Sequence, residues 1–327
     1  MKVCHFIASK GLGRGEFYID LVNELSKTLD IRLVVPKNAK FLHRVSKNVN
    51  IIELESSISR FNPFLILELY RIFKNLNPTI VHTHFAKATE IFYWINKVLK
   101  LKHVATKHNP RKAKIYEKIK YVTAVSKDVA MSIKHENVKI IYNGISPKLD
   151  LPCIQHPKTP FTISAIGRLD KIKGYDILIE ECSKLQFDFI LQIVGNGPEK
   201  EKLASLIQKY NLNGKVILLG FKENIPEIMN NSDLIVISSH SEGFSLTMIE
   251  ALFYAPLLIS TKVSGSTEIL TNDFLIDEFQ ISDKINLIAK NYTQFQTIFF
   301  SLKANQCYRF VLPVISKEYV NFYRSIY

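Results

Sequence analysis

The feature that most constrains the fold is an alternation of short apolar runs with longer amphipathic segments along almost the whole chain. Short apolar runs bounded by turn signals are typical of buried strands, and apolar residues at helical spacing indicate helices. Such an alternation builds a parallel sheet covered by helices on both faces. In the first half it predicts strands at residues 3–8, 31–35, 49–54, 79–84, 103–107, 122–125 and 138–141, and helices at 63–76, 87–99 and from Lys127.

A proline-rich stretch divides the chain. With 327 residues the chain is too long for one compact core, and periodicity is lost over residues 147–160, where four prolines stand. We predict an α/β domain at 1–146, a linker at 147–160, a second α/β domain at 161–313, and a terminal helix at 314–327 that crosses back to the first domain. The second domain is predicted to have strands at 162–166, 189–194, 216–219, 234–237 and 257–260, and helices at 175–185, 199–209 and 225–229.

Composition narrows the environment and the partners. The formal net charge of +13 favours acidic partners, which include nucleic acid, anionic lipid headgroups and phosphorylated small molecules. The four cysteines have no CxxC spacing, so we expect neither disulfides nor a structural zinc, and a reducing cytosol. The first residues lack the pattern of a signal peptide, and no apolar stretch approaches the length of a membrane span. We therefore expect a cytoplasmic protein.

Four loops of the second domain carry residues suited to a ligand. Ligands of parallel sheets bind beyond the carboxyl ends of the strands, and each of these loops follows a predicted strand. Together they combine cations, glycine turns, carboxylates and a helix that is predicted to open near Ser245 and to place Glu250 two turns inside it. The loops are Gly167-Arg168-Leu169-Asp170-Lys171-Ile172-Lys173-Gly174, Gly195-Asn196-Gly197-Pro198, the stretch 242–250, and Gly265-Ser266-Thr267-Glu268.

This combination favours a diphosphate with an attached ribose. Arg168 can fork onto phosphate oxygens and Lys173 can act as a point charge. The helix N-terminus offers free N–H groups to an anion, and Glu250 suits ribose hydroxyls. Each feature alone has another interpretation, since the two cations can be a solvated loop and Glu242 a loop carboxylate favoured by the helix dipole. Their order and spacing favour the ligand site.

Candidate residues of the first domain also lie at strand ends. A glycine loop follows the first strand, and its glycines are either a ligand loop or a flexible strand-to-helix turn. His82 and His84 share one face of a strand, an arrangement that can bind a metal. No third ligand is evident, so we expect no bound metal. His108 is either functional or a capped loop histidine. The loop glycines are Gly11, Gly13 and Gly15.

The chain resembles the family-4 retaining glycosyltransferases, which have the GT-B fold of two doubly wound Rossmann-like domains facing a central cleft. The likeness covers nearly the whole chain and is stronger in the second domain. The residues that carry it are Gly167-Arg168-Leu169 with Lys173-Gly174, Gly195-x-Gly197-Pro198, and Glu242-Gly243-Phe244 with Glu250-Ala251 as the family's E-x7-E motif, supported by Asn143-Gly144, Thr123-Ala124-Val125-Ser126 and His82-x-His84.

The resemblance implies a role for each candidate. Arg168 and Lys173 would hold the diphosphate of a nucleotide-sugar donor, while His108 and Glu242 would act at the reacting sugar. No metal and no cofactor would be needed. The backbone amides of Gly243, Phe244 and Ser245 would add to phosphate binding. The nucleotide would contact Glu250, Gly195 and Gly197, and the acceptor side would include His84 and the loop glycines Gly11, Gly13 and Gly15.

We therefore expect a retaining glycosyltransferase that moves a sugar from a nucleotide sugar, UDP-linked rather than GDP-linked, to a cell-surface glycan or a lipid-linked acceptor in lipopolysaccharide, capsule or oligosaccharide biosynthesis. Basic residues of the first domain, near Phe61, Phe64 and Tyr93, suit peripheral docking on the cytoplasmic face of an anionic inner membrane, or form an ordinary solvated surface. The alternatives are a GT-B sugar phosphorylase or epimerase, and a basic nucleic-acid-binding protein. No recognised nucleic-acid motif is present, so we expect no nucleic-acid partner.

Overall fold

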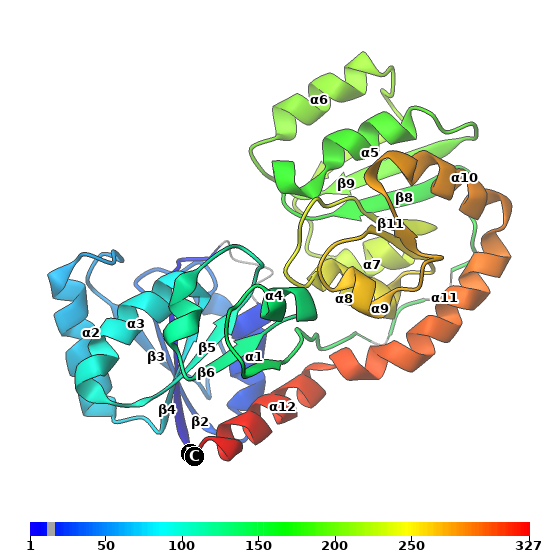
Figure 1. Ribbon diagram of the computed structural model, residues 1–327. Helices are drawn as coiled ribbons and strands as arrows, with labels where there is room; N and C mark the ends of the chain where they lie inside the picture. The colour runs from blue at the N-terminus through cyan, green and yellow to red at the C-terminus, as the bar shows by residue number, and fades with distance from the viewer. Residues whose placement is uncertain (12–16, 149, 153) are drawn as a thin grey trace. The chain divides into compact units, whose positions relative to one another are not determined.

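The computed structural model describes residues 1–11, 17–148, 150–152 and 154–327. The chain forms two compact units (Figure 1). Unit 1 contains Met1–Ser146 together with Phe310–Tyr327, and unit 2 contains Pro147–Arg309. In the described part of the chain, no helix is both long and apolar enough to cross a membrane.

Unit 1 is built on a seven-stranded parallel sheet with the order β3-β2-β1-β4-β5-β6-β7. The chain adds strands to one side of β1 and then crosses to β4 on its other side. This reversal makes the carboxyl ends of β1 and β4 a topological switch point, where ligands of open α/β sheets bind. The strands are β1 (Lys2–Ile7), β2 (Asp30–Pro36), β3 (Asn50–Leu54), β4 (Ile80–His84), β5 (Lys102–Lys107), β6 (Tyr121–Ala124) and β7 (Val138–Ile140).

The helices of unit 1 bury opposite faces of this sheet. Cys4 and Phe6 of β1 pack into an apolar core with residues of α2 and α3. Because side chains alternate along a strand, His5 belongs to the opposite face, and α1 packs against α12. The helices are α1 (Phe17–Leu25), α2 (Pro63–Leu76), α3 (Phe85–Leu99), α4 (Lys127–Met131) and α12 (Leu312–Ser325), with short 3-10 turns η1 (Leu42–Arg44) and η2 (Lys114–Lys118). A further 3-10 turn, η5 (Cys307–Phe310), spans the boundary with unit 2.

Unit 2 repeats the design with a six-stranded parallel sheet in the order β10-β9-β8-β11-β12-β13. Here the strand order reverses between β8 and β11, which places a second switch point at their carboxyl ends. The strands are β8 (Phe161–Ile166), β9 (Phe189–Val194), β10 (Val216–Gly220), β11 (Leu234–Ile237), β12 (Leu258–Thr261) and β13 (Leu275–Ile276).

Most predicted elements of unit 2 are present, but its last part was not predicted. The pattern gave no signal for β13 or for the helices α9, α10 and α11. In α11 the exposed Ile298 and Phe300 blur the stripe made by its buried residues. The helices are α5 (Tyr175–Cys182), α6 (Lys200–Lys209), α7 (Ile225–Asn230), α8 (Leu246–Tyr254), α9 (Ser266–Ile269), α10 (Ile281–Lys290) and α11 (Tyr292–Gln306), with 3-10 turns η3 (Lys171–Lys173) and η4 (Glu278–Gln280).

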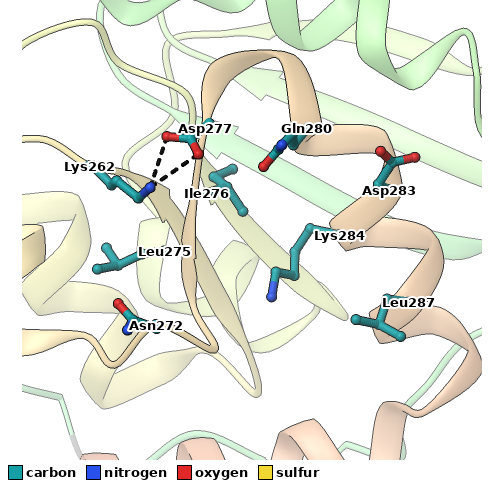
Figure 2. A pocket seen from close by; sticks show the side chains of 9 residues that line it. All are labelled: Lys262, Asn272, Leu275, Ile276, Asp277, Gln280, Asp283, Lys284 and Leu287. Carbon is teal, nitrogen blue, oxygen red and sulfur yellow. Dashed lines mark hydrogen bonds and ion pairs between the residues drawn. The ribbon is translucent and has the colours of Figure 1, made fainter.

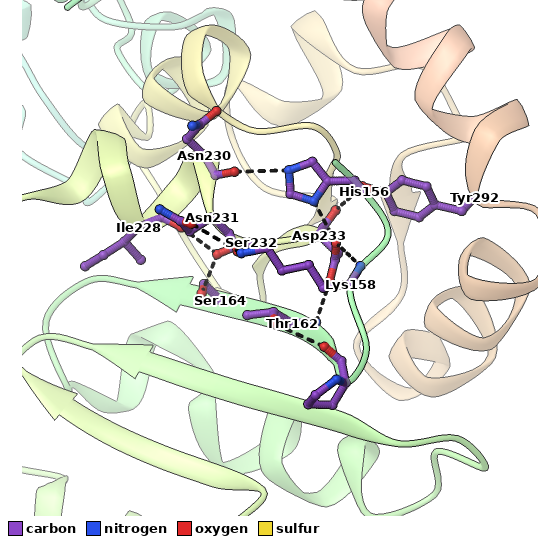
Figure 3. Close-up of polar contacts among 11 residues, drawn as sticks. His156, Lys158, Thr162, Ser164, Ile228, Asn230, Asn231, Ser232, Asp233 and Tyr292 are labelled. Carbon is purple, nitrogen blue, oxygen red and sulfur yellow. Dashed lines mark hydrogen bonds and ion pairs between the residues drawn. The ribbon is translucent and has the colours of Figure 1, made fainter. Parts of the chain in front are cut away.

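The predicted linker has no helix or strand among its described residues and belongs to unit 2. The buried carboxylate of Asp233 fixes its end (Figure 3). Asp233 accepts hydrogen bonds from the backbone N–H of Lys158 at 2.9 Å and of Thr162 at 2.6 Å, and its Oδ1 lies 2.7 Å from Nδ1 of His156. The end of the proline-rich stretch and the start of β8 are therefore both anchored to the start of β11.

Candidate active site

The four loops predicted from the sequence follow β8, β9, β11 and β12, which are consecutive neighbours in the sheet of unit 2. Backbone hydrogen bonds connect the first two loops. Leu169 N–H donates to the carbonyl of Asn196 at 3.0 Å, and Glu199 N–H donates to the carbonyl of Leu169 at 3.1 Å. The loops after β8 and β9 are thus one rigid piece beside the switch point.

Glycine is required where these two loops touch. A Cβ atom on Gly195, whose φ is +142°, would lie 1.9 Å from the carbonyl oxygen of Gly167. A Cβ on Gly197 would lie 2.2 Å from the carbonyl oxygen of Leu169. No side chain fits at such distances, so both glycines serve the contact between the loops. The structure thus uses these glycines for a contact between two loops of the protein, and nucleotide contact by them stays a prediction.

The other loops join the same edge. His240 N–H donates to the carbonyl of Ile172 at 2.8 Å, which connects the loop after β11 to the loop after β8. The loop after β12 reaches the same stretch, since the Ser264 hydroxyl donates to the carbonyl of Gly243 at 2.9 Å. A Cβ on Gly265 would lie 2.5 Å from the ring of Phe244. All four loops therefore meet around the switch point of unit 2.

The charged side chains of this edge pair with one another. Lys173 Nζ lies 2.6 Å from Glu242 Oε1, which also accepts from the Ser239 hydroxyl at 2.7 Å. Arg168 forms an ion pair with Asp170 and is about half exposed. The sequence suggested that Lys173 binds the diphosphate and Glu242 the sugar, but in the structure the two side chains form an ion pair that fixes both of them. An incoming phosphate would compete with Glu242 for this ammonium group.

The helix after the third loop begins where the sequence predicts. The Ser245 hydroxyl caps α8 and accepts from Met248 N–H at 3.4 Å. Since α8 starts at Leu246, Glu250 lies one turn inside the helix, not the two turns predicted. Its half-buried position is therefore nearer to the helix N-terminus, and to the N–H groups there, than the sequence suggested.

A second group of candidates lies at the switch point of unit 1. His5 of β1 is the register partner of His82 of β4, and their side chains share the face covered by α1 and α12. His5 Nδ1 lies 3.0 Å from His84 Nε2, and His84 Nδ1 lies 3.1 Å from His108 Nε2. Three imidazoles from β1, β4 and the loop after β5 thus form a hydrogen-bonded chain, which we call the histidine chain (His5, His84 and His108).

Most of the potential metal donors are already engaged in hydrogen bonds. One ring nitrogen each of His5, His82 and His84 lies within 4.8 Å of the other two, so His5 supplies the third ligand that the sequence did not reveal. His82, however, contacts the Tyr323 hydroxyl and the Thr106 hydroxyl, both at 2.6 Å. Both nitrogens of His84 are also used within the histidine chain. A metal would have to replace these bonds, and metal independence stays a prediction.

Burial keeps these imidazoles neutral. It lowers the pKa of His5 and of His108 to about 3. Burial, and then repulsion between the neighbouring rings, lowers the pKa of His82 and His84 well below the ordinary histidine value. Near neutral pH, His108 is therefore a hydrogen-bonding group rather than a cation.

Backbone strain marks the same place. Phe85, the first residue of α3, has a φ of +66°, a conformation that a bulky side chain rarely adopts. Its ring centroid lies 4.4 Å from that of His108 and 5.6 Å from that of Tyr18. Strained residues concentrate at functional sites, where the surrounding structure holds them in place. The strain therefore supports a functional role for the His108 region.

Comparison with known proteins identifies the family. The profile described as "Glycosyltransferase Family 4" matches residues 15–149, and that described as "Glycosyl transferases group 1" matches residues 152–297. The chain belongs to the family-4 glycosyltransferases.

Two relatives illustrate the similarity. The lipopolysaccharide core biosynthesis glycosyltransferase LpsD of Rhizobium meliloti is 21% identical to this chain over 301 residues, which are 88% of this chain and 86% of LpsD. A Campylobacter jejuni N-acetylgalactosaminyltransferase, named for a diphospho-undecaprenol acceptor, is 35% identical to this chain over 150 residues. This stretch is 43% of this chain but only 40% of that protein.

Solved structures confirm the GT-B fold of this glycosyltransferase. HepE of Anabaena in complex with UDP superposes with a TM-score of 0.83 at 18% identity, over 99% of this chain and 100% of that one. A glycosyltransferase of Rickettsia africae gives a TM-score of 0.84 at 21% identity, over 99% of this chain and 98% of that one. At these identities the likeness concerns the fold alone.

The remaining candidates lie in unit 1 of the glycosyltransferase. Gly11 has a φ of +68°, while Gly13 and Gly15 lie outside the described residues. His84 is completely buried and contacts His108 through Nδ1, and a role for it toward the acceptor stays a prediction. The sequence missed His5 because only the pairing of β1 with β4 brings it to the other histidines.

A hollow of about 440 Å³ lies at the β13 edge of unit 2 (Figure 2). Its lining includes Lys262 and Asp277, which form an ion pair at 3.0 Å, and residues of α10. None of the predicted donor-binding residues lines it. The candidate donor site of the glycosyltransferase is therefore the strand-end loops at the switch point, and not this hollow.

Proposed function

We propose that this glycosyltransferase transfers a sugar, with retention of configuration and without a metal, from a UDP-linked donor to a cell-surface glycan or a lipid-linked acceptor. The observation that carries the proposal is the meeting of four loops around the switch point of unit 2. They bring together Lys173, Arg168, the N-terminus of α8 and Glu250. A diphosphate needs cations and free N–H groups, and a ribose needs an acceptor for its hydroxyls.

The proposed mechanism relies on stabilising the departing diphosphate. Arg168 and Lys173 face the charge that develops as the bond from sugar to phosphate breaks, and one well-placed donor contributes about 3–4 kcal/mol to such a step. Glu242 releases Lys173 to the phosphate and turns to the sugar. Glu250 holds the ribose, and His108 donates a hydrogen bond at the reacting sugar.

The names of similar proteins support the choice of donor and acceptor. HepE of Anabaena has been solved with UDP and with UDP-glucose, which favours a uridine nucleotide. LpsD of Rhizobium meliloti is named for lipopolysaccharide core biosynthesis, and WclY of Escherichia coli for O-antigen biosynthesis. We propose that the acceptor of this chain is a glycan of the same class, assembled at the cell surface or on a lipid carrier.

Replacing Glu250 tests the donor site. Glu250→Ala is expected to lower kcat/KM for the nucleotide sugar about 10- to 100-fold, because a hydrogen bond to a charged group contributes about 1.5–3 kcal/mol. The assay follows release of UDP, GDP or ADP from a panel of nucleotide sugars with a glycolipid extract as acceptor. Glu201→Ala, which changes an exposed glutamate of α6, is the control. Absence of transfer from every donor, or full activity of Glu250→Ala, contradicts the proposal.

We also propose that unit 1 docks on an anionic membrane. Phe61 and Phe64 are 90% and 75% exposed at the start of α2, next to the cationic Arg60. On α3, Trp94 is 53% exposed, and Lys97 Nζ lies 4.3 Å from its ring centroid. Exposed aromatic rings beside cations suit the headgroup region of an anionic bilayer.

Vesicle binding measures this docking. Phe61→Ser combined with Phe64→Ser is expected to lower the fraction of protein that sediments with phosphatidylglycerol vesicles at least about fivefold. The reason is that burying one phenylalanine side chain contributes about 1.5–3 kcal/mol to binding. Phe279→Ser, which changes a phenylalanine of unit 2 that is 76% exposed, is the matched control. Equal binding of wild type to phosphatidylglycerol and phosphatidylcholine vesicles, or loss in the control alone, would rule out the proposed surface.

A further inference from the structure

We propose that His84 and His5 are positioning residues that set the tautomer of His108, so that this ring offers an Nδ1–H donor to the substrate. The inference rests on the proposed function, because it places His108 at the reacting sugar. Its direct readout is the protonation pattern of three rings, which is measured without any turnover.

The histidine chain has two self-consistent proton arrangements. His84 is neutral, so it carries one N–H and one bare nitrogen, and it uses one for His5 and the other for His108. In the first arrangement every ring is protonated at Nδ1, and hydrogen bonds run from His5 to His84 to His108. In the second, every ring is protonated at Nε2 and the bonds run the other way. The position of the proton on His108 therefore depends on the other two rings.

The buried end of the chain favours the first arrangement. His5 Nε2 is fully buried, and it has no hydrogen-bond partner among the described residues. In the second arrangement this nitrogen would carry an N–H group without a protein acceptor, and orphaned buried N–H groups are rare. In the first arrangement Nε2 is a bare ring nitrogen. We therefore place the proton of each ring on Nδ1.

The surroundings hold His108 in one orientation. The ring of Phe85, on its strained backbone, lies against the His108 ring, and Tyr18 approaches it edge-on at 6.4 Å. With Nε2 occupied by His84, the nitrogen left for a ligand is Nδ1. In the first arrangement this nitrogen is a donor, which suits a hydroxyl oxygen of a sugar. The chain thus converts a ring that can donate or accept into a fixed donor.

Histidine ¹⁵N NMR on the full-length protein tests the tautomers. In wild type at pH 7.5, the ¹⁵N shifts are expected to show His5, His84 and His108 protonated at Nδ1. His84→Leu removes the partner of His108 and is expected to leave that ring as a mixture of tautomers. His84→Asn keeps an amide group at the position of Nδ1, so it is expected to retain the Nδ1–H form of His108. His103→Leu, which changes a buried histidine that bonds to Thr83 instead, is the control.

Kinetics of the same variants separates positioning from loss of structure. With a UDP-sugar, His84→Leu is expected to lower kcat at least tenfold while the donor KM changes less than threefold, and His84→Asn to recover most of the kcat. An Nε2–H or doubly protonated His108 in wild type, or a His108 tautomer unchanged in His84→Leu, overturns the inference. If wild type transfers no sugar but the tautomers are as expected, the proposed function fails and the positioning of His108 stands.

Discussion

Lowering the pH from about 7.5 to about 5.5 is expected to destabilise unit 1 by several kcal/mol, enough to unfold much of it. Its sheet buries His5, His82, His84 and His103 with at most 7% exposure. Burial lowers the pKa of His103 to about 3, as it does for His5, and the pKa values of His82 and His84 are lowered too. All four rings are uncharged in the folded protein throughout this pH range.

The loss of stability at low pH follows from the number of protons that the folded and unfolded states bind. Histidines of the unfolded chain titrate near pH 6.5, so below that pH the unfolded state binds more protons than the folded state. The contribution of these neutral rings to the stability of unit 1 is fully present above about pH 6.5. It is lost as the pH falls from there toward the pKa of the folded state. Each such ring lowers the free energy of unfolding by about 1.4 kcal/mol per pH unit below about 6.5, so the four rings together lower it by about 5–6 kcal/mol at pH 5.5. Domains are stable by only about 5–15 kcal/mol.

Tryptophan fluorescence measures this effect in unit 1 alone, because the single tryptophan of the chain is Trp94 of α3. Urea unfolding at a series of pH values is expected to give a midpoint that falls steeply below pH 6.5. In His103→Leu the pH dependence is expected to be shallower by about 1.4 kcal/mol per pH unit. A midpoint that stays constant down to pH 5.5 would mean that these rings are accessible to protons in the folded state.

Replacing Asp233 with alanine is expected to destabilise unit 2 by about 3–5 kcal/mol, the range for breaking a buried charged network. The carboxylate is fully buried and accepts from two backbone N–H groups and from the ring of His156, as Figure 3 shows. Its removal leaves the N–H groups of Thr162 and Lys158 without their acceptor. It also frees the end of the linker from the start of β11.

Hydrogen exchange read by mass spectrometry locates the damage. In Asp233→Ala, peptides from β8, β11 and residues 154–160 are expected to lose protection first. Asp188→Ala, which removes an exposed carboxylate just before β9, is the control and is expected to change stability by less than about 0.5 kcal/mol. Equal protection in the two variants would show that the carboxylate does not anchor the linker.

The layered α/β architecture and the order of the strand-end loops could be predicted from local sequence patterns. Periodicity is a local property, so a run such as Leu234–Ile237 and the start of a helix near Ser245 are visible without knowledge of their partners. The spacing from Glu242 to Glu250 was visible in the same way. Local patterns failed for the short edge strand β13, and for α11, where exposed apolar residues obscure the buried stripe.

The contacts between residues far apart in the chain became visible in the folded structure. Lys173 pairs with Glu242, and His5 with His84, because parallel strands far apart in the chain become neighbours at a switch point. Nothing local in a strand says which other strand will lie beside it. The neutral state of the histidine chain was equally hidden, since burial depends on helices that cover the sheet from elsewhere in the chain.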